Sequence, residues 1–176
     1  MTVTILTTER LILRSVDEAD FDTLFDMTFS NAEVMQYAFE AKVLSKEDAM
    51  AFFLRDFDHQ GCGTKIGVFV DKASDELVGF GGPVACSALG DNDYEVGFVL
   101  GREFWGKGYA TEIGKAQIKH VTNTIGCKRA IALVSPNNTV SIAVLNKIGM
   151  THYQTIDTPQ RGKREVYAAL AMDVKP

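Results

Sequence analysis

The chain has 176 residues, of which 46% are hydrophobic and 23% charged, and its net charge is −5. This composition is that of a globular protein, and the length fits a single domain spanning residues 1–176, which excludes the disordered and fibrous classes. We expect no signal peptide, and no apolar run is near the roughly 20 residues that cross a bilayer, so we expect a cytoplasmic protein without a membrane partner. Because the chain is acidic, we also expect no nucleic-acid partner.

The first half of the chain is predicted to mix strands and helices. Residues 10–16 have the pattern of a first strand, and a helix with apolar residues at helical spacing follows from Asp17. Ser45, with acidic residues in the next turn, is typical of the N-cap of a second helix. Two apolar runs, 65–70 and 77–85, are separated by a polar segment, which predicts a hairpin.

The middle of the chain carries a strand, a glycine-containing loop and a helix. Residues 94–100 alternate with a period of two and place Glu95 on the second face of one strand. The loop of residues 101–108 follows, and helical spacing begins at Ala110. The loop glycines are therefore expected between a strand and a helix.

The last third is predicted to hold three strands and a short helix. Residues 129–134 are an apolar strand, and the helix near 140–148 is expected to stop at Gly149. Two late strands are expected near 152–156 and 165–172. The order of elements predicts a mixed α/β fold in which one sheet is flanked by a few helices.

Cysteine and histidine are scattered along the chain, as Cys62, Cys86, Cys127, His59, His120 and His152. An odd number of cysteines without a C-x-x-C spacing argues against both a disulfide framework and a zinc site. We therefore expect buried free thiols and no metal.

A glycine-containing turn before a helix is suited to binding phosphate. The N-terminus of a helix exposes unpaired backbone N–H groups and a partial positive charge. Gly106 and Gly108 leave room for a pyrophosphate there, and Lys107 adds a cation. No Asp or Glu occurs from Ile113 to Ile156, so repulsive charge is absent from the segment that follows. By itself, the glycine pair is equally compatible with a nucleotide loop or a tight turn.

Two common phosphate-binding motifs do not fit the sequence. A dinucleotide-binding fold needs a third glycine and an acidic residue about 20 positions past the loop, and both are missing. A Walker loop needs Gly-Lys followed by Ser or Thr, which does not occur. In a dinucleotide-binding fold that acidic residue binds a ribose hydroxyl. The remaining possibility is a phosphate-bearing ligand that makes no such contact.

Several sequence blocks occur together: Thr-Glu-Arg-Leu-Ile-Leu-Arg at 8–14, Tyr-Glu-Val-Gly-Phe at 94–98, Phe-Trp-Gly-Lys-Gly-Tyr-Ala-Thr-Glu at 104–112, and Asn-Lys-Ile-Gly-Met at 146–150, the last preceded by Asn138 and Ser141. With these blocks the chain resembles the GNAT superfamily of N-acetyltransferases, and within it the RimJ/RimL-like branch that acetylates ribosomal-protein N-termini. The resemblance implies a splayed, mostly antiparallel mixed sheet of about seven strands flanked by about four helices. Trp105 departs from the superfamily pattern, which has Arg or Gln at this position of the loop, whereas Gly108 and Ala110 match.

The resemblance also implies acetyl-CoA as the co-substrate. The backbone of Phe98, Val99 and Leu100 would pair with the pantetheine arm like an added strand. The further coenzyme contacts that it implies are Trp105, Gly106, Lys107, Gly108, Tyr109 and Ala110 around the pyrophosphate, together with Asn138 and Asn146. Such an arm needs a gap between the strands at 94–100 and 129–134, in which a backbone N–H would polarise the thioester carbonyl.

Two residues are candidates for catalysis. An alkyl amine is protonated at neutral pH, so a base must remove a proton before the nitrogen attacks the thioester. Glu95 is the candidate base, and a solvated surface carboxylate is the alternative. Many members of the superfamily use a Tyr as the acid, but Leu145 stands at that position here. Ser141 is the substitute that the branch suggests, and a helix-start hydroxyl is the alternative.

Three functions are compared. The first is an enzyme that acetylates a small amine or a ribosomal or other protein N-terminus, and the acidic first hundred residues suit a cationic acceptor. The second is a non-catalytic acyl-CoA sensor, which the departures at Trp105 and Leu145 favour. A nucleic-acid binder is disfavoured by the net acidity of the chain. A monomer and a homodimer are both compatible with the sequence.

Overall fold

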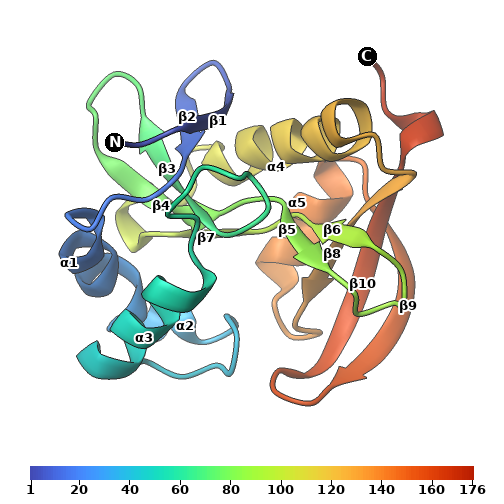
Figure 1. Ribbon diagram of the computed structural model, residues 1–176. Helices are drawn as coiled ribbons and strands as arrows, with labels where there is room; N and C mark the ends of the chain where they lie inside the picture. Colours follow the sequence, from blue (N-terminus) through green and yellow to red (C-terminus); the bar gives the residue numbers. More distant parts are fainter.

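The computed structural model describes residues 1–176 and contains two five-stranded sheets (Figure 1). The first sheet is antiparallel and runs β1 (Thr4–Thr7), β2 (Leu11–Arg14), β3 (Gly67–Asp71), β4 (Leu77–Gly81) and β7 (Phe98–Leu100). The second runs β5 (Val84–Cys86), β6 (Asp93–Glu95), β8 (Arg129–Val134), β10 (Gly162–Leu170) and β9 (Thr151–Thr158). Within it, β6 and β8 are parallel and the other neighbours are antiparallel.

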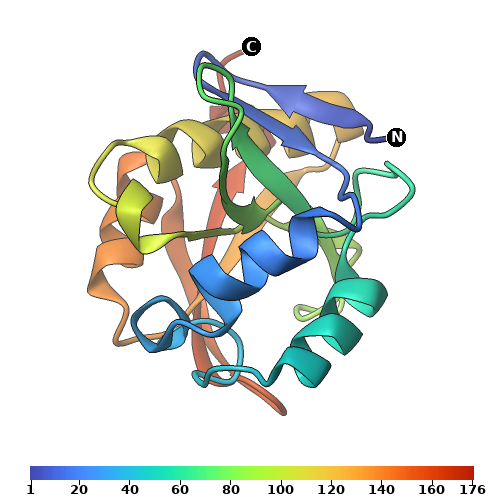
Figure 2. The same ribbon diagram turned by 90° about the vertical axis from the view of Figure 1, so that its left-hand side faces the viewer.

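Five α-helices cover these sheets: α1 (Asp20–Leu24), α2 (Ala32–Met35), α3 (Lys46–Asp56), α4 (Tyr109–Lys119) and α5 (Thr139–Lys147). Both α1 and α4 run directly into π-helical segments, Phe25–Phe29 and His120–Ile125. Figures 1 and 2 show the first three helices on one side of the first sheet and α4 on the other.

Alternation along β3 and β4 explains why helices pack on both faces of the first sheet. Val68 and Phe80 point into a core formed with the aromatic side chains of α1 and α3. Phe69 and Val78 point to the opposite face, where they pack with Ile113 of α4. A further core lies between α4, α5 and the second sheet. Because successive strand residues face opposite sides, one short apolar run supplies two cores.

The local signals for helix ends are confirmed. The Ser45 hydroxyl accepts a hydrogen bond from the Asp48 N–H at 3.0 Å, which satisfies one of the free donors in the first turn of α3. Gly149 follows α5 with a φ of 92°, a left-handed conformation that glycine adopts without steric cost.

The expected α/β fold with a splayed, mostly antiparallel arrangement is confirmed, but ten strands replace about seven. The run 94–100 is divided between β6 and β7, and 77–85 between β4 and β5, because this long hairpin leaves one sheet and enters the other. The crossing brings Gly81 against Gly97, and a Cβ on Gly81 would lie 2.2 Å from the Gly97 carbonyl oxygen. β1 was not predicted and pairs with β2 along the edge.

The expectation of buried thiols is wrong for Cys62, which is exposed, and overstated for Cys86 and Cys127, which are partly buried. Cys62 lies in a surface loop between α3 and β3, so no core surrounds it. None of the helices has both the length and the apolar character needed to cross a membrane.

Candidate active site

The two sheets separate where the hairpin crosses between them. β6 and β8 are joined at Glu95 and Ile131, and the Val96 N–H donates to the Ile131 carbonyl at 2.8 Å. Beyond this bridge β7 pairs only with β4, so its other edge has no neighbouring strand. A Cβ placed on Gly97, just before β7, would meet no atom within 4 Å, so the face of the chain is open at this point. A split therefore begins at Glu95 and continues along β7.

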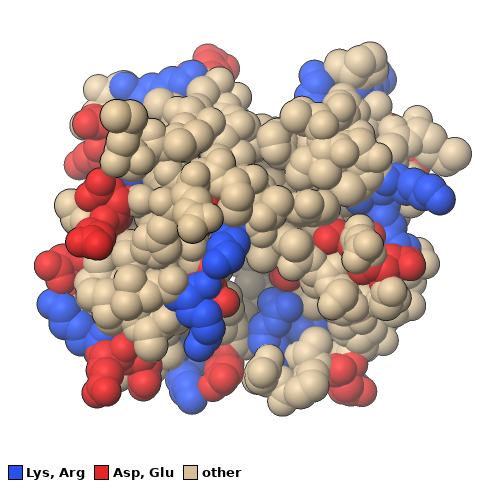
Figure 3. Space-filling view, in the orientation of Figure 1, with Lys and Arg blue, Asp and Glu red and all other residues tan.

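Two helices begin at the same end of this split. Because β6 and β8 run parallel, the chain leaves β7 and β8 in the same direction, and α4 and α5 follow them. The crevice beyond the carboxyl ends of parallel strands is where ligands bind in many α/β proteins. Figure 3 shows a hollow between the two halves of the molecule, with charged atoms on its walls.

The loop before α4 presents a run of unpaired main-chain donors. Gly106 and Gly108 have φ values of 72° and 80°, in the left-handed region that glycine permits. The N–H groups of residues 106–111 donate to no protein acceptor, whereas the Glu112 N–H donates to the Gly108 carbonyl at 3.0 Å. Six consecutive donors at the start of an eleven-residue helix form a concave site for an anion.

Side chains fix the shape of this loop from outside. The indole N–H of Trp105 donates to the Leu100 carbonyl at 3.0 Å, and the Arg102 guanidinium lies over the indole ring at 4.9 Å. Arg10 donates to the Lys107 carbonyl at 2.8 Å and so ties the loop to the first sheet. Trp105 therefore closes the turn between β7 and α4, a structural contribution from the residue that departs from the family pattern.

Glu95 lies at the closed end of the split and is partly buried. Its carboxylate accepts hydrogen bonds from the Arg161 guanidinium at 3.3 and 3.5 Å, so it is paired with a cation and not freely solvated. Arg161 belongs to the turn between β9 and β10, 66 residues further along the chain. Both residues belong to the second sheet or its turns, since β6 and β10 each pair with β8.

The predicted residues of the last block lie at the start and along the body of α5. The Asn138 side chain caps the helix by accepting from the Ser141 N–H at 3.2 Å. The Ser141 hydroxyl is partly buried and makes no protein hydrogen bond, and Asn146 is exposed. Leu145 is 3% exposed and packs in the core, so this position holds no acid.

Comparison with known proteins decides the family. The sequence model of the acetyltransferase (GNAT) domain matches residues 10–151. The chain belongs to the GNAT acetyltransferase family. The Bacillus subtilis protein YnaD, described as an N-acetyltransferase, is 32% identical over 145 residues, which cover 82% of this chain and 81% of YnaD. The expectation of an N-acetyltransferase is thus confirmed at the level of the family.

Solved GNAT structures share the fold. The GNAT-family acetyltransferase of Bacillus anthracis superposes with a TM-score of 0.79 at 27% identity, over 98% of this chain and 99% of that one. RimL in complex with coenzyme A superposes with a TM-score of 0.72 at 18% identity, over 98% of this chain and all of RimL. At that identity the likeness to RimL concerns the fold alone.

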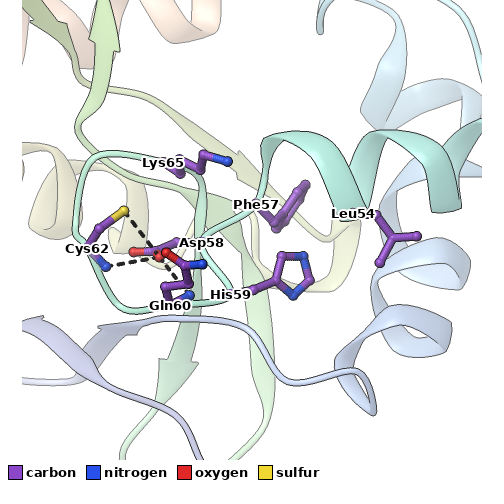
Figure 4. A pocket seen from close by; sticks show the side chains of 7 residues that line it. All are labelled: Leu54, Phe57, Asp58, His59, Gln60, Cys62 and Lys65. Carbon is purple, nitrogen blue, oxygen red and sulfur yellow. Dashed lines mark hydrogen bonds between the residues drawn. The ribbon is translucent and has the colours of Figure 1, made fainter.

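A smaller hollow in this GNAT chain lies beside Asp58, away from the split (Figure 4). The Asp58 carboxylate accepts from the N–H groups of Gly61, Cys62 and Gly63 at 2.7 to 3.0 Å. These hydrogen bonds hold the pKa of Asp58 below its usual range, although burial acts in the opposite sense. The carboxylate therefore closes a loop, and we assign this hollow a structural role.

Sequence reasoning missed three residues of the split: Gln117, Arg161 and Arg164. Gln117 offered a signal, because it is a polar residue at an apolar position of the periodic pattern, and its side chain is 0% exposed. Arg161 and Arg164 carried no signal, since the contact of this hairpin with Glu95 forms only in the folded chain. The six free donors agree with the predicted phosphate loop, whereas the roles of the other candidate residues stay predictions.

Proposed function

We propose that this chain binds acetyl-CoA in the split between its sheets and transfers the acetyl group to a primary amine. The observation that carries the proposal is the run of six unpaired N–H groups at the start of α4, directly after the free edge of β7. An anion cradle next to an unpaired strand edge suits a ligand with a pyrophosphate at one end and an amide-containing arm at the other.

The coenzyme contacts follow from this arrangement. The pyrophosphate would take the N–H groups of residues 106–111, and the Lys107 side chain would add a cation. The backbone of β7 offers the hydrogen-bonding groups of a missing strand to the two amides of pantetheine. Because the Asn138 oxygen is occupied by its cap, its side-chain NH2 group remains to hold the arm from the α5 side. Asn146, exposed on the same helix, is a more distant candidate.

The chemistry requires a base at the closed end of the split. Acetyl-CoA supplies the thioester. The acceptor ammonium first gives one proton to Glu95, the carboxylate at the start of the split, directly or through water. The neutral nitrogen then forms a bond to the acetyl carbon, the carbon–sulfur bond breaks, and the nitrogen releases its second proton, which balances the proton that the departing thiolate gains. Release of Glu95 from Arg161 accompanies acceptor binding.

Ser141 is proposed to donate the proton that the leaving thiolate gains. Its hydroxyl has no other hydrogen-bond partner, and α5 begins at the same end of the split as α4. A thiolate has a pKa near 8.5 and leaves with modest help, so a hydroxyl suffices where Leu145 has replaced a phenol.

We further propose that residues 1–176 act as one domain, because the β4–β5 and β6–β7 hairpin belongs to both sheets. A protein N-terminus, the acceptor that the description of RimL names for that protein, is proposed as one class of acceptor, and a small amine is the other.

Two measurements test the proposal. Titration calorimetry should show saturable binding of coenzyme A, and thiol release from acetyl-CoA should require an added amine. Failure to bind coenzyme A at millimolar concentration would refute it. Binding without amine-dependent thiol release would indicate the acyl-CoA sensor instead.

A further inference from the structure

Two arginines belong to the β9–β10 hairpin whose turn contacts Glu95. Arg161, in the turn, donates to the Glu95 carboxylate, and Arg164 lies near the start of β10 on the same hairpin. Burial is the largest cause of the lowered pKa of Arg164, Arg161 lowers it further, and Glu95 raises it. Glu95 therefore faces one guanidinium directly, and a second, buried guanidinium lies on the same hairpin.

The Arg161–Glu95 pair is loose compared with the other bidentate arginine–carboxylate pairs of the molecule. Arg14 holds Asp20 at 2.8 and 2.9 Å, and Arg129 holds Asp93 at 2.8 Å through two nitrogens. The Arg161 contacts with Glu95 measure 3.3 and 3.5 Å, longer than the usual 2.7 to 2.9 Å of charge-assisted hydrogen bonds. A ligand carboxylate that forms two short hydrogen bonds with Arg161 would therefore replace Glu95 at little cost in free energy.

Arg164 is buried without a carboxylate partner. It is 6% exposed, and its guanidinium donates only to the carbonyls of Lys163 and Phe39 at 3.0 and 2.8 Å. Phe39 lies between α2 and α3 with a φ of 50°, which is costly for a residue other than glycine. Burying an arginine without a counter-ion is also costly, so both features favour a site that a ligand completes.

We propose that the amine acceptor carries a carboxylate next to its amine, as an α- or β-amino acid does, and that Arg161 and Arg164 bind that carboxylate. This inference rests on the proposed acetyl transfer. The acceptor carboxylate takes Arg161 from Glu95, and the freed Glu95 faces the acceptor ammonium. The two charges of the zwitterion are thereby matched by adjacent opposite charges on the protein. The expectation of a cationic acceptor, drawn from the acidic first hundred residues, is narrowed by this proposal to an acceptor that also carries a carboxylate.

The test compares amino acids with the amines obtained by removing their carboxylate. Pairs such as phenylalanine with phenylethylamine and ornithine with putrescine, together with spermidine, are supplied with acetyl-CoA, and thiol release is followed. The expected result is that one or more amino acids are acetylated with a kcat/KM at least about tenfold above that of the matched amine. Equal or greater rates with the amines or spermidine, or no turnover of any amino acid, overturn the inference.

Variants of the turn connect the preference to the two arginines. Arg161→Gln should raise the KM for the preferred amino acid at least about tenfold, and Arg161→Lys should restore part of the loss. Lys163→Gln is the matched control, because it removes an exposed charge from the same hairpin. An unchanged amino-acid KM in both Arg161→Gln and Arg164→Lys, with thermal melting confirming the fold, contradicts the inference.

Coenzyme binding separates the two levels of the proposal. Calorimetry of Arg161→Gln with coenzyme A, in the absence of an acceptor, should give the wild-type affinity. If wild-type protein fails to bind coenzyme A, the proposed function itself falls. If it binds coenzyme A and acetylates amines equally well with and without a carboxylate, only the proposed binding of the acceptor carboxylate by Arg161 and Arg164 is refuted.

Discussion

The side-chain amide of Gln117 holds the Gly97 peptide from both sides. The Gly97 N–H donates to Gln117 Oε1 at 2.9 Å, and Gln117 Nε2 donates to the Gly97 carbonyl at 2.9 Å. The side chain thus takes the place of a neighbouring strand at the point where the pairing of β6 with β8 ends and β7 begins. It satisfies the Gly97 N–H, which has no other partner, and it is a second donor to the Gly97 carbonyl, which also accepts from the Gly82 N–H at 3.3 Å.

Replacing Gln117 by leucine should therefore weaken both stability and coenzyme binding. Leaving the Gly97 N–H unpaired costs about 1–3 kcal/mol, which urea unfolding would register as a lower midpoint. Gln154→Leu, at an exposed position of β9, is the control and should leave both quantities unchanged. Equal midpoints for Gln117→Leu and the control would show that the hydrogen bonds between Gln117 and Gly97 contribute nothing to stability.

Gly106→Ala should weaken coenzyme binding beyond its effect on stability. A Cβ there meets no protein atom within 4 Å, but it would stand in the proposed pyrophosphate cradle. Gly126→Ala is a matched control, because Gly126 also has a positive φ, 85° against 72°, and open surroundings. Both variants should lose about 1–2 kcal/mol of stability to the left-handed backbone. Calorimetry should show at least about a tenfold loss of affinity in Gly106→Ala alone, and parallel losses in both would place the pyrophosphate elsewhere.

Glu95→Gln should separate chemistry from binding. The amide keeps the size of the side chain but cannot take a proton, so kcat should fall by about 100-fold or more. The affinity for coenzyme A, measured by calorimetry, should stay within about twofold because the cradle is untouched. Wild-type turnover would remove Glu95 from the mechanism and leave it a structural partner of Arg161.

Ser141→Ala tests the proposed acid with little risk to the fold. The cap of α5 uses the Ser141 N–H, which alanine retains, so the melting temperature should not change. Loss of the hydroxyl should lower kcat by about tenfold, since a thiolate departs with modest assistance. An unaltered kcat would mean that solvent protonates the thiolate.

Tyr109 and Asp71 give the stability a defined pH window. The Tyr109 hydroxyl donates to the Asp71 carboxylate at 2.6 Å, and this bond is the main cause of the lowered pKa of Asp71 and the raised pKa of Tyr109. The contribution of Asp71 is present above its unfolded pKa of about 3.9 and is lost as the pH falls through the folded value. That of Tyr109 is present below about 10 and is lost as the pH rises through its raised value.

Tyr109→Phe should therefore be less stable than wild type near neutral pH, and the difference should shrink in acid and in strong alkali. Urea midpoints measured from pH 3 to 11 would check this, with Tyr153→Phe on β9 as a surface control. A difference that does not vary with pH would assign the effect of Tyr109 to packing.

The sequence by itself determined the elements whose signals are local. The Ser45 cap, the glycine-containing turn before α4 and the stop at Gly149 each depend on a few neighbouring residues, so the helices they bound could be read directly. The α/β class and the prediction of a phosphate loop followed from the same short-range rules, because hydrophobic period and turn chemistry act within one element.

Only the tertiary structure decided how the strands are shared between the sheets and what surrounds Glu95. The split of residues 94–100 into β6 and β7 depends on contacts with β4 and β8, which no alternation of residue types encodes. Arg161 contacts Glu95 from a hairpin turn far along the chain, and Gln117 reaches Gly97 from a different element. The charge of a side chain is fixed by the sequence, but its partner is fixed by packing, so the proposed acceptor end of the site could be inferred only from the fold.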